Sequence, residues 1–472
     1  MPNLKNKELI STRVESRSIK NQKVKNEQIK RLLKENLTNF LALAIIKIIL
    51  TPHLIIKLFL SLCILGSSGL TSYLVIQSII TYFNYGVTTT SRTIRETPTL
   101  FPKVTFCNLN MFQTEYAYNI TKIGKFDYDS SYLSLEEKRM LGHSLDDIMF
   151  GCSFNFMPCK SSDFIWSYDV EYGNCYTFNS GVDSNGSRMD LKDQVMHGSE
   201  YGLTLKIFVD VHEGLLGSQA KSLGAIVRIG NSSYSILNLK GDGVLVSPGF
   251  QTNILVEREF KSMLPRPYSN CEIDENIPKL FQELDLYNLI SKSEYKYTQQ
   301  LCFIQCYQRY LIEKFNCTSP EFFSIFNVNK CRSDSVELIY ESNIDFNSNF
   351  INEKCISLCP LECYQQLFKT SLSFSQDLGE YELISIVKKS SNLSKDFINR
   401  TIDLRTVRDS FVNINVFYGS LSYTLTTEAP QTDGIKLFAD IGGNLGFYLG
   451  VSVFSLFEIF EVIVEIFFIL KK

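Results

Sequence analysis

Residues 58–80 read LFLSLCILGSSGLTSYLVIQSII and carry no formal charge. As a helix, these 23 residues would reach about 34 Å at 1.5 Å per residue, and the hydrocarbon core of a bilayer is about 30 Å thick. Tyr82, Phe83 and Tyr85 follow, as aromatic residues do at a membrane–water interface. We therefore expect a membrane-spanning helix over residues 54–83. A buried core helix has a similar composition, whereas a signal peptide would be shorter and begin nearer residue 1.

A second apolar stretch lies near the end of the chain. Residues 441–457 are uncharged, and Glu458, Glu461 and Glu465 interrupt the apolar run that follows. Their spacings of three and four residues place the carboxylates on one helical face, which should meet water or protein because a carboxylate in lipid is costly. We predict a second span over residues 439–470, with these glutamates at the inner mouth of any pore.

Charge and cysteine content indicate on which side of the membrane each segment lies. Residues 1–53 contain eleven Lys/Arg against four Asp/Glu, and two lysines close the chain at 471–472. Cationic segments remain in the cytoplasm, so we expect both termini there, in a plasma-membrane protein with two spans. Residues 84–438 hold twelve of the thirteen cysteines, which favours an extracellular, oxidising compartment. Six glycosylation sequons lie in the same segment, at Asn119, Asn185, Asn231, Asn316, Asn392 and Asn399.

The extracellular segment is expected to be a disulfide-rich α+β domain with a β core. Strand-like runs cover residues 103–107, 203–209, 225–229, 243–246 and 412–423, and helical periodicity covers 280–290 and 298–315. The cysteines lack the C-x2-C spacing of zinc knuckles, so we favour disulfides, with Cys63 left as a free thiol in a packed first span. Four histidines offer little for a zinc enzyme or a His-based triad. We predict no enzyme activity, no metal site and no cofactor.

The glycines of the second span allow two interpretations. Gly442, Gly446 and Gly450 recur every four residues, a spacing typical of close packing between membrane helices. Glycine also lets a helix open where its carbonyls line a wet cavity, and Gly450, Val451 and Ser452 would then offer oxygen ligands to a small cation. The residues alone favour neither interpretation. A pore would require several copies of the chain around one axis.

Several motifs are similar to those of one family. They read FPKVTFCN at residues 101–108, YGNCYTFN at 172–179, SPGFQT at 247–252, LPRPYSNC at 264–271, DIGG at 440–443 and GVS at 450–452. In this order and spacing they resemble the epithelial sodium channel/degenerin superfamily, which includes acid-sensing and FMRFamide peptide-gated channels. The resemblance covers almost the whole chain from about residue 54.

The resemblance implies a homo- or heterotrimeric, sodium-selective channel that is blocked by amiloride and carries helical thumb and finger elements on its β core. It implies that Gly450, Val451 and Ser452 form the selectivity filter. Ala439 falls at the degenerin position, where a bulky side chain should hold the pore open.

Two further features follow from the resemblance. Tyr85 and Tyr268 fall at the wrist, which couples the extracellular domain to the pore. The implied disulfides are Cys107–Cys175, Cys152–Cys159, Cys271–Cys363, Cys302–Cys359, Cys306–Cys355 and Cys317–Cys331.

The sequence leaves the gating stimulus open. Analogy favours a neuropeptide of the FMRFamide type, and the alternatives are proton gating, constitutive activity and mechanical gating. Proton gating needs histidine or carboxylate pairs of raised pKa, but residues 85–88 lack the histidine of acid-sensing channels and Asp146–Asp147 is read as solvated loop charge. The cytoplasmic His-Gly motif of many members is replaced by FLAL at 40–43, with an effect that we do not predict.

A protein of a different class also fits part of the sequence. A two-span receptor that binds a partner without conducting would need neither the break at 450–452 nor the glutamate stripe. A membrane-anchored hydrolase is disfavoured because GVSVF at 450–454 lacks the final glycine of a nucleophile elbow.

Overall fold

The computed structural model describes residues 48, 52–111, 114–122, 133–169, 171–183, 186–209, 222–231, 239–272, 285–293, 296–320, 322–331, 346, 354–376, 379, 381, 383–384, 404–450 and 453–471. Two compact units make up the chain, residues 1–88 with 429–472 and residues 89–428. The predicted cytoplasmic segment 1–53, with the FLAL stretch at 40–43, lies almost wholly outside the described residues.

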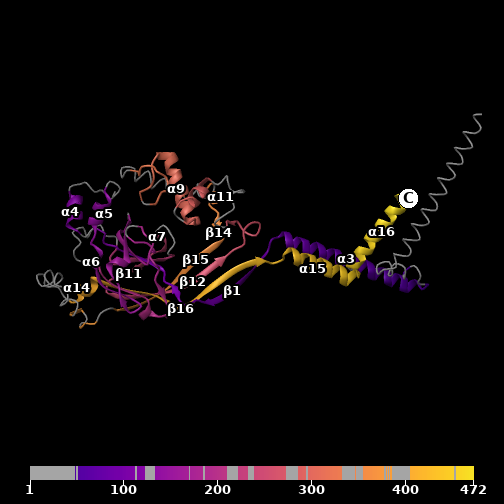
Figure 1. Cartoon of the computed structure of the whole chain (residues 1–472), viewed down its shortest axis with the longest axis horizontal. Coiled ribbons are helices and arrows are strands. Elements are labelled where there is room, and N and C mark those ends of the chain that lie inside the picture. Colours follow the sequence, from indigo (N-terminus) through magenta and orange to yellow (C-terminus); the bar gives the residue numbers. More distant parts are fainter. Residues whose placement is uncertain are drawn as a thin grey trace, which may run out of the picture. The chain divides into compact units, whose positions relative to one another are not determined.

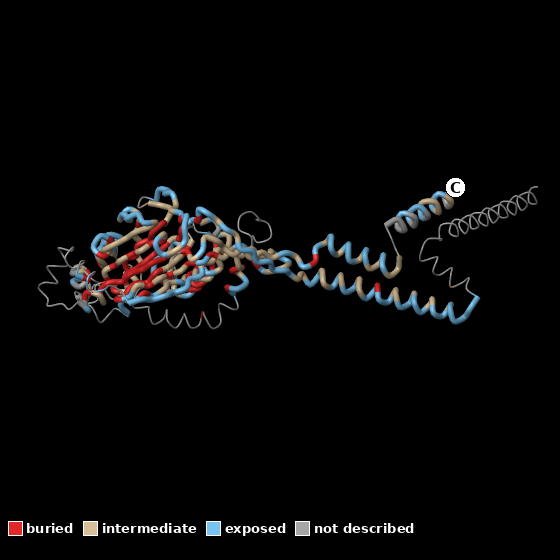
Figure 2. Tube along the Cα trace, turned by 90° about the horizontal axis from the view of Figure 1, so that it is seen from below, coloured by how far each residue is buried: buried red, intermediate tan, exposed pale blue. Residues whose placement is uncertain are grey.

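In the part of the first unit that the structure describes, three long helices are seen (Figure 1). α15 (Gly434–Leu449) packs beside α3 (Leu54–Phe83), and α16 (Val453–Lys471) follows α15 in the sequence. Among the described helices, α3 alone has the length and mean hydropathy, 1.9, to cross a membrane. Most of its side chains are exposed, and Thr71 is its one buried residue (Figure 2). Such an apolar exposed surface requires lipid or neighbouring protein around it.

The residues at the two ends of α15 explain its limits. Asp433 is the N-cap, and its carboxylate accepts a hydrogen bond from the Lys436 amide over 2.7 Å. Gly450 has a φ of +66°, in the left-handed region that ends helices and favours glycine. The second apolar stretch is therefore divided at Gly450, and its first helix begins before residue 439, where we expected the span to start.

Two β-sheets form the framework of the second unit. The larger sheet has the strand order β15–β12–β16–β9–β4–β5, with β1 also paired to β16, and the smaller has the order β11–β10–β3–β7–β6. Two short ladders pair β2 with β8 and β13 with β14. The strands are β1 (Val87–Arg95), β2 (Thr99–Leu100), β3 (Lys103–Asn108), β4 (Met149–Phe154), β5 (Met157–Pro158), β6 (Phe164–Asp169), β7 (Gly173–Phe178), β8 (Asp193–Gln194), β9 (Leu203–Phe208), β10 (Ala225–Gly230), β11 (Val244–Val246), β12 (Phe250–Ser262), β13 (Cys271–Glu272), β14 (Leu361–Glu362), β15 (Tyr364–Gln376) and β16 (Phe411–Pro430).

One hydrophobic core joins the two large sheets. Phe106 and Phe178 of the smaller sheet and Ile254 and Val416 of the larger one belong to the same buried cluster. β16 runs parallel to β12 and antiparallel to β9, so it lies in the middle of the larger sheet. Together with the helices of this unit, this arrangement confirms the predicted α+β class with a β core.

Short helices and one longer helix surround the sheets. Thr298 caps α9 (Gln299–Phe315), in agreement with the helix expected over 298–315. Phe346 is buried against Tyr307 and Tyr310 of α9, with ring centroids 4.9 and 5.6 Å apart. Among the described residues, the other helices are α4 (Glu115–Lys122), α5 (Leu135–Leu141), α6 (Leu145–Ile148), η2 (Ser161–Asp163), η3 (Ser199–Tyr201), α7 (Leu239–Asp242), α8 (Asp285–Ser291), α11 (Ile356–Leu358) and α14 (Leu404–Asp409).

Candidate functional site

The predicted filter coincides with the interruption between α15 and α16. The Gly450 amide still donates to the Gly446 carbonyl over 3.0 Å, but the left-handed backbone of Gly450 turns the chain out of the helix. Val451 and Ser452 lie outside the described residues. A helix that ends at this point leaves its last carbonyl groups without helical partners, and such groups can face a hydrated cation.

Within a single chain, the described residues leave the surface of α15 near the predicted degenerin position uncovered. Ala439 is exposed. A Cβ built on Gly442 or Gly443 would meet no atom within 4 Å. These two glycines therefore make no close contact with α3, and the room around them is available to other molecules.

The predicted carboxylate stripe lies on α16. Glu461 is exposed and Glu465 is half-buried. The side chain of Glu458 lies outside the described residues. The described helix thus carries at least two of the three carboxylates at the predicted spacing.

The ends of α3 and α15 are joined by a backbone hydrogen bond. Gln431, three residues before α15, donates its amide to the Gly86 carbonyl over 2.8 Å. The preceding residue, Tyr85, has a φ of +51°. Tyr268 belongs to the other unit, in the turn after β12. The wrist role of Tyr85 and Tyr268 therefore stays a prediction.

Six disulfides connect the cysteines of the second unit. They are Cys107–Cys175, Cys152–Cys159, Cys271–Cys363, Cys302–Cys359, Cys306–Cys355 and Cys317–Cys331, the pairs that the resemblance implies. Cys63 is unpaired and exposed on α3, rather than packed as we expected. The described residues hold no cluster of His, Cys, Asp or Glu suited to a metal ion.

The predicted glycosylation sites differ in accessibility. Asn119 and Asn316 are exposed. Asn231 is half-buried, and its side-chain amide donates to Gln366 Oε1 over 2.7 Å, so it is less accessible than the other two. Asn185, Asn392 and Asn399 lie outside the described residues.

A buried arginine was not found by the sequence reasoning. Arg258 lies on β12, and its guanidinium forms an ion pair with Glu96, which follows β1, at 2.5 Å. The rings of Tyr418 and Tyr423 on β16 lie 5.3 Å from the same guanidinium. Alternation could have found it, since Arg258 continues a row of inward-facing residues on β12. It connects the first strand after α3 to the strand that leads into α15.

Comparison with known proteins identifies the family. A model of the amiloride-sensitive sodium channels matches residues 43–139 and 114–462. The chain belongs to the amiloride-sensitive sodium channel family. This is a family of ion channels, not of enzymes.

Relatives within this family include epithelial and acid-sensing channels. The epithelial sodium channel subunit beta-2 of Xenopus laevis is 25% identical over 345 residues, which cover 71% of this chain and 50% of that protein. Acid-sensing ion channel 1C of Danio rerio is 26% identical over 458 residues, with 88% and 80% covered. Acid-sensing ion channel 1 of Gallus gallus is 23% identical over 444 residues, with 86% and 78% covered. The chain thus spans about half the length of the epithelial subunits that it matches.

Proposed function

We propose that this chain is a subunit of a trimeric, sodium-selective, amiloride-sensitive channel of the plasma membrane, with both termini in the cytoplasm. Its partners are copies of itself or related subunits. The observation that carries the proposal is the interruption of the second apolar stretch at Gly450. A helix that only packs against its neighbours in the membrane would not need this interruption.

The proposed conduction path uses three copies of α15 and α16 around one axis. The open surface at Gly442 and Gly443 supports this arrangement, because backbones of neighbouring copies can approach closely there. At 450–452, carbonyl groups and the Ser452 hydroxyl replace part of the hydration shell of Na⁺. Glu461 and Glu465, further along α16, raise the local cation concentration at the inner mouth.

A peptide of the FMRFamide type is the proposed gating stimulus, and acid is the alternative. Burial raises the pKa of Asp169, as acid sensing requires, but this carboxylate accepts hydrogen bonds from the Glu171 and Tyr172 amides and so stabilises a turn. The Asp147 carboxylate accepts a hydrogen bond from the Ser144 amide at the start of α6. Neither carboxylate therefore supports acid gating over the peptide. Constitutive opening is a further outcome of the test, and mechanical opening is the remaining alternative.

The test is to express Ala439→Phe in oocytes without any agonist, with Ala439→Ser as the matched small-residue control. We expect an amiloride-blocked sodium current from Ala439→Phe only. Silence of Ala439→Phe that is present at the surface, alone and together with related subunits, would contradict a channel and favour a non-conducting receptor. For the parent chain, FMRFamide application and an acid step then separate the two stimuli, and a current before either indicates constitutive opening.

A further inference from the structure

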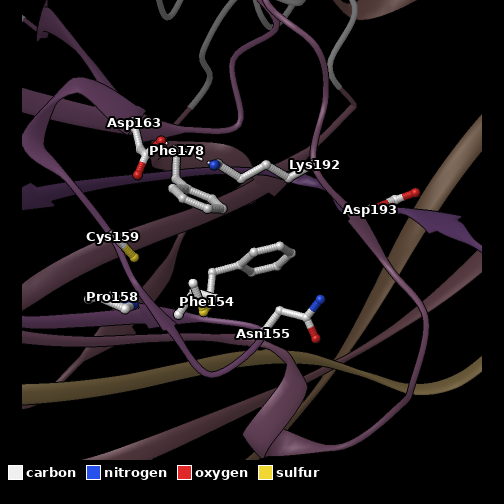
Figure 3. Close-up of a pocket in the computed structure, with 9 residues that line it drawn as sticks. Phe154, Asn155, Pro158, Cys159, Asp163, Phe178, Lys192 and Asp193 are labelled. Atoms are coloured by element: carbon white, nitrogen blue, oxygen red, sulfur yellow. Dashed lines mark ion pairs between the residues drawn. The ribbon is translucent and has the colours of Figure 1, made fainter.

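A small cavity lies beside the β4–β5 hairpin of the second unit (Figure 3). Its volume is about 280 Å³. The Cys152–Cys159 disulfide closes the hairpin on one side of it. Asn155 and Phe156, both with positive φ, form the tight turn of the hairpin. The position of this wall is therefore fixed covalently.

Two aromatic rings form the apolar part of the cavity. The rings of Phe154 and Phe178 lie 5.4 Å apart and both project into it (Figure 3). Phe178 is fully buried and Phe154 is half-buried, so Phe154 offers the accessible ring. Met157, 70% exposed, adds a flexible apolar side chain at the rim. An apolar cavity of about 150 Å³ accepts a benzene ring, so this one has room for a ring and a short chain.

Three charged residues also line the cavity, Asp163, Lys192 and Asp193. Lys192 extends over the Phe178 ring, with Nζ 5.7 Å from the ring centroid, and pairs with Asp163 at 3.1 Å (Figure 3). This pairing neutralises the one cationic side chain of the lining. Asp193, next to it, is exposed and gives the lining an excess negative charge. A cation is therefore attracted to the rim, whereas an anion would have to displace Asp163.

We propose that this cavity binds an aromatic ring that carries a cationic group a few bonds away. The ring packs on Phe154 and Met157, and the cation pairs with Asp193. A peptide with a basic residue near an aromatic one has this chemistry, as does a free arylalkylamine. The peptide source rests on the peptide gating proposed above.

The test measures binding to the purified full-length chain, with FMRFamide and phenethylamine as separate probes. Asp193→Asn should weaken binding about three- to fivefold, and more at low salt, because one exposed ion pair is lost. Met157→Trp should weaken it at least about tenfold by filling the cavity. The matched controls are Asp190→Asn and Met189→Trp, which change exposed residues of the neighbouring segment outside the lining and should leave the affinity unchanged.

The outcomes separate this site from the gating proposal. FMRFamide binding that is weakened by both cavity variants supports the site with a peptide ligand. Phenethylamine binding alone, with the same pattern of variants, supports the site and counts against peptide gating. Equal affinity of all variants, or no binding of either probe, overturns the site. The Ala439→Phe current tests the channel independently of each of these results.

Discussion

The Gly86 carbonyl accepts a hydrogen bond from the Gln431 amide, and a Cβ on Gly86 would clash with Gln431 Oε1. Gly86 follows α3 and Gln431 precedes α15, so this contact connects the two helices at one end. The close approach is to the far end of a flexible side chain, so a larger residue at position 86 requires the Gln431 side chain to move. Movement of either helix end relative to the other would stretch or break this hydrogen bond.

Gly86→Val should disturb this contact and reduce the agonist-independent current of Ala439→Phe. The overpacking is expected to cost about 1–3 kcal/mol. Gly86→Ala should be milder, because the Gln431 side chain can rotate away. The measurement is current per surface-labelled subunit. Gln431→Ala in the Gly86→Val background should recover part of the current, and no recovery would show that the clash lies elsewhere.

Arg258→Met should destabilise the second unit. It leaves the Glu96 carboxylate without its partner and removes the guanidinium from the Tyr418 and Tyr423 rings. Because Glu96 is 44% exposed, we expect a loss of about 2 kcal/mol, less than for a fully buried pair. Urea unfolding of the purified chain measures it. The stability of Arg258→Lys should lie between that of the parent chain and that of Arg258→Met. Arg188→Met, which changes an exposed arginine, serves as the control. Equal midpoints for Arg258→Met and Arg188→Met would refute the role.

Lys369→Gln should lower stability in a pH-dependent way. The ion pair between Lys369 Nζ and Glu259 Oε2, 2.6 Å apart, lowers the pKa of Glu259 below its ordinary 4.5 and raises the pKa of Lys369 above 10.5. The ionised Glu259 carboxylate stabilises the folded state. This contribution to the unfolding free energy is fully present above the unfolded-state pKa and is lost as the pH falls through the lower, folded-state pKa. The Lys369 ammonium group contributes to the unfolding free energy in the opposite sense. Its contribution is fully present below the unfolded-state pKa of 10.5 and is lost as the pH rises through the higher, folded-state pKa.

The measurement for this pair is the melting temperature of Lys369→Gln and of the parent chain at two pH values. The variant should melt lower at pH 7 and should approach the parent at an acidic pH below the lowered pKa of Glu259, where the carboxylate is protonated. The exposed Lys160→Gln controls for the loss of one positive charge. A deficit of the same size at both pH values would exclude this ion pair as its cause.

Glu461→Gln and Glu465→Gln should each reduce the single-channel conductance of the Ala439→Phe channel. The removed carboxylates would no longer concentrate cations at the inner mouth, and the reduction should grow at low ionic strength because screening is weaker there. Glu136→Gln, on α5 of the second unit, is the control with the same chemical change. Conductance that is unchanged at low salt would place these glutamates outside the ion path.

The sequence predicted elements whose pattern is local. The alternation of residues 203–209 and the Thr298 cap of α9 identify a strand and a helix without knowledge of the rest of the fold. β15 was missed because it lies at the edge of its sheet and is largely exposed, so it has no alternating buried face. Local patterns therefore identify some elements with one buried side, although β12, whose buried residues alternate, was missed as well.

The candidate site was predictable only in part, for a related reason. The glycine of the helix interruption is a local signal, and Gly450 could be named from it. The ion pair of Arg258 joins residues 162 positions apart, and no spacing in the sequence brings Glu96 to it. The cavity at Phe154 likewise depends on Phe178 and Lys192, which come from other segments.

The two disulfides of α9 have a mechanical consequence. Cys302 and Cys306 are one helical turn apart, and their partners Cys359 and Cys355 are also four residues apart, in reverse order. A single disulfide would still allow α9 to rotate about the bond. Two successive disulfides prevent α9 from rotating about its own axis against the 355–359 segment. If this region moves when a ligand binds, α9 and the 355–359 segment must move together as one rigid body. Any change of backbone conformation must then occur in the chain outside the two disulfides.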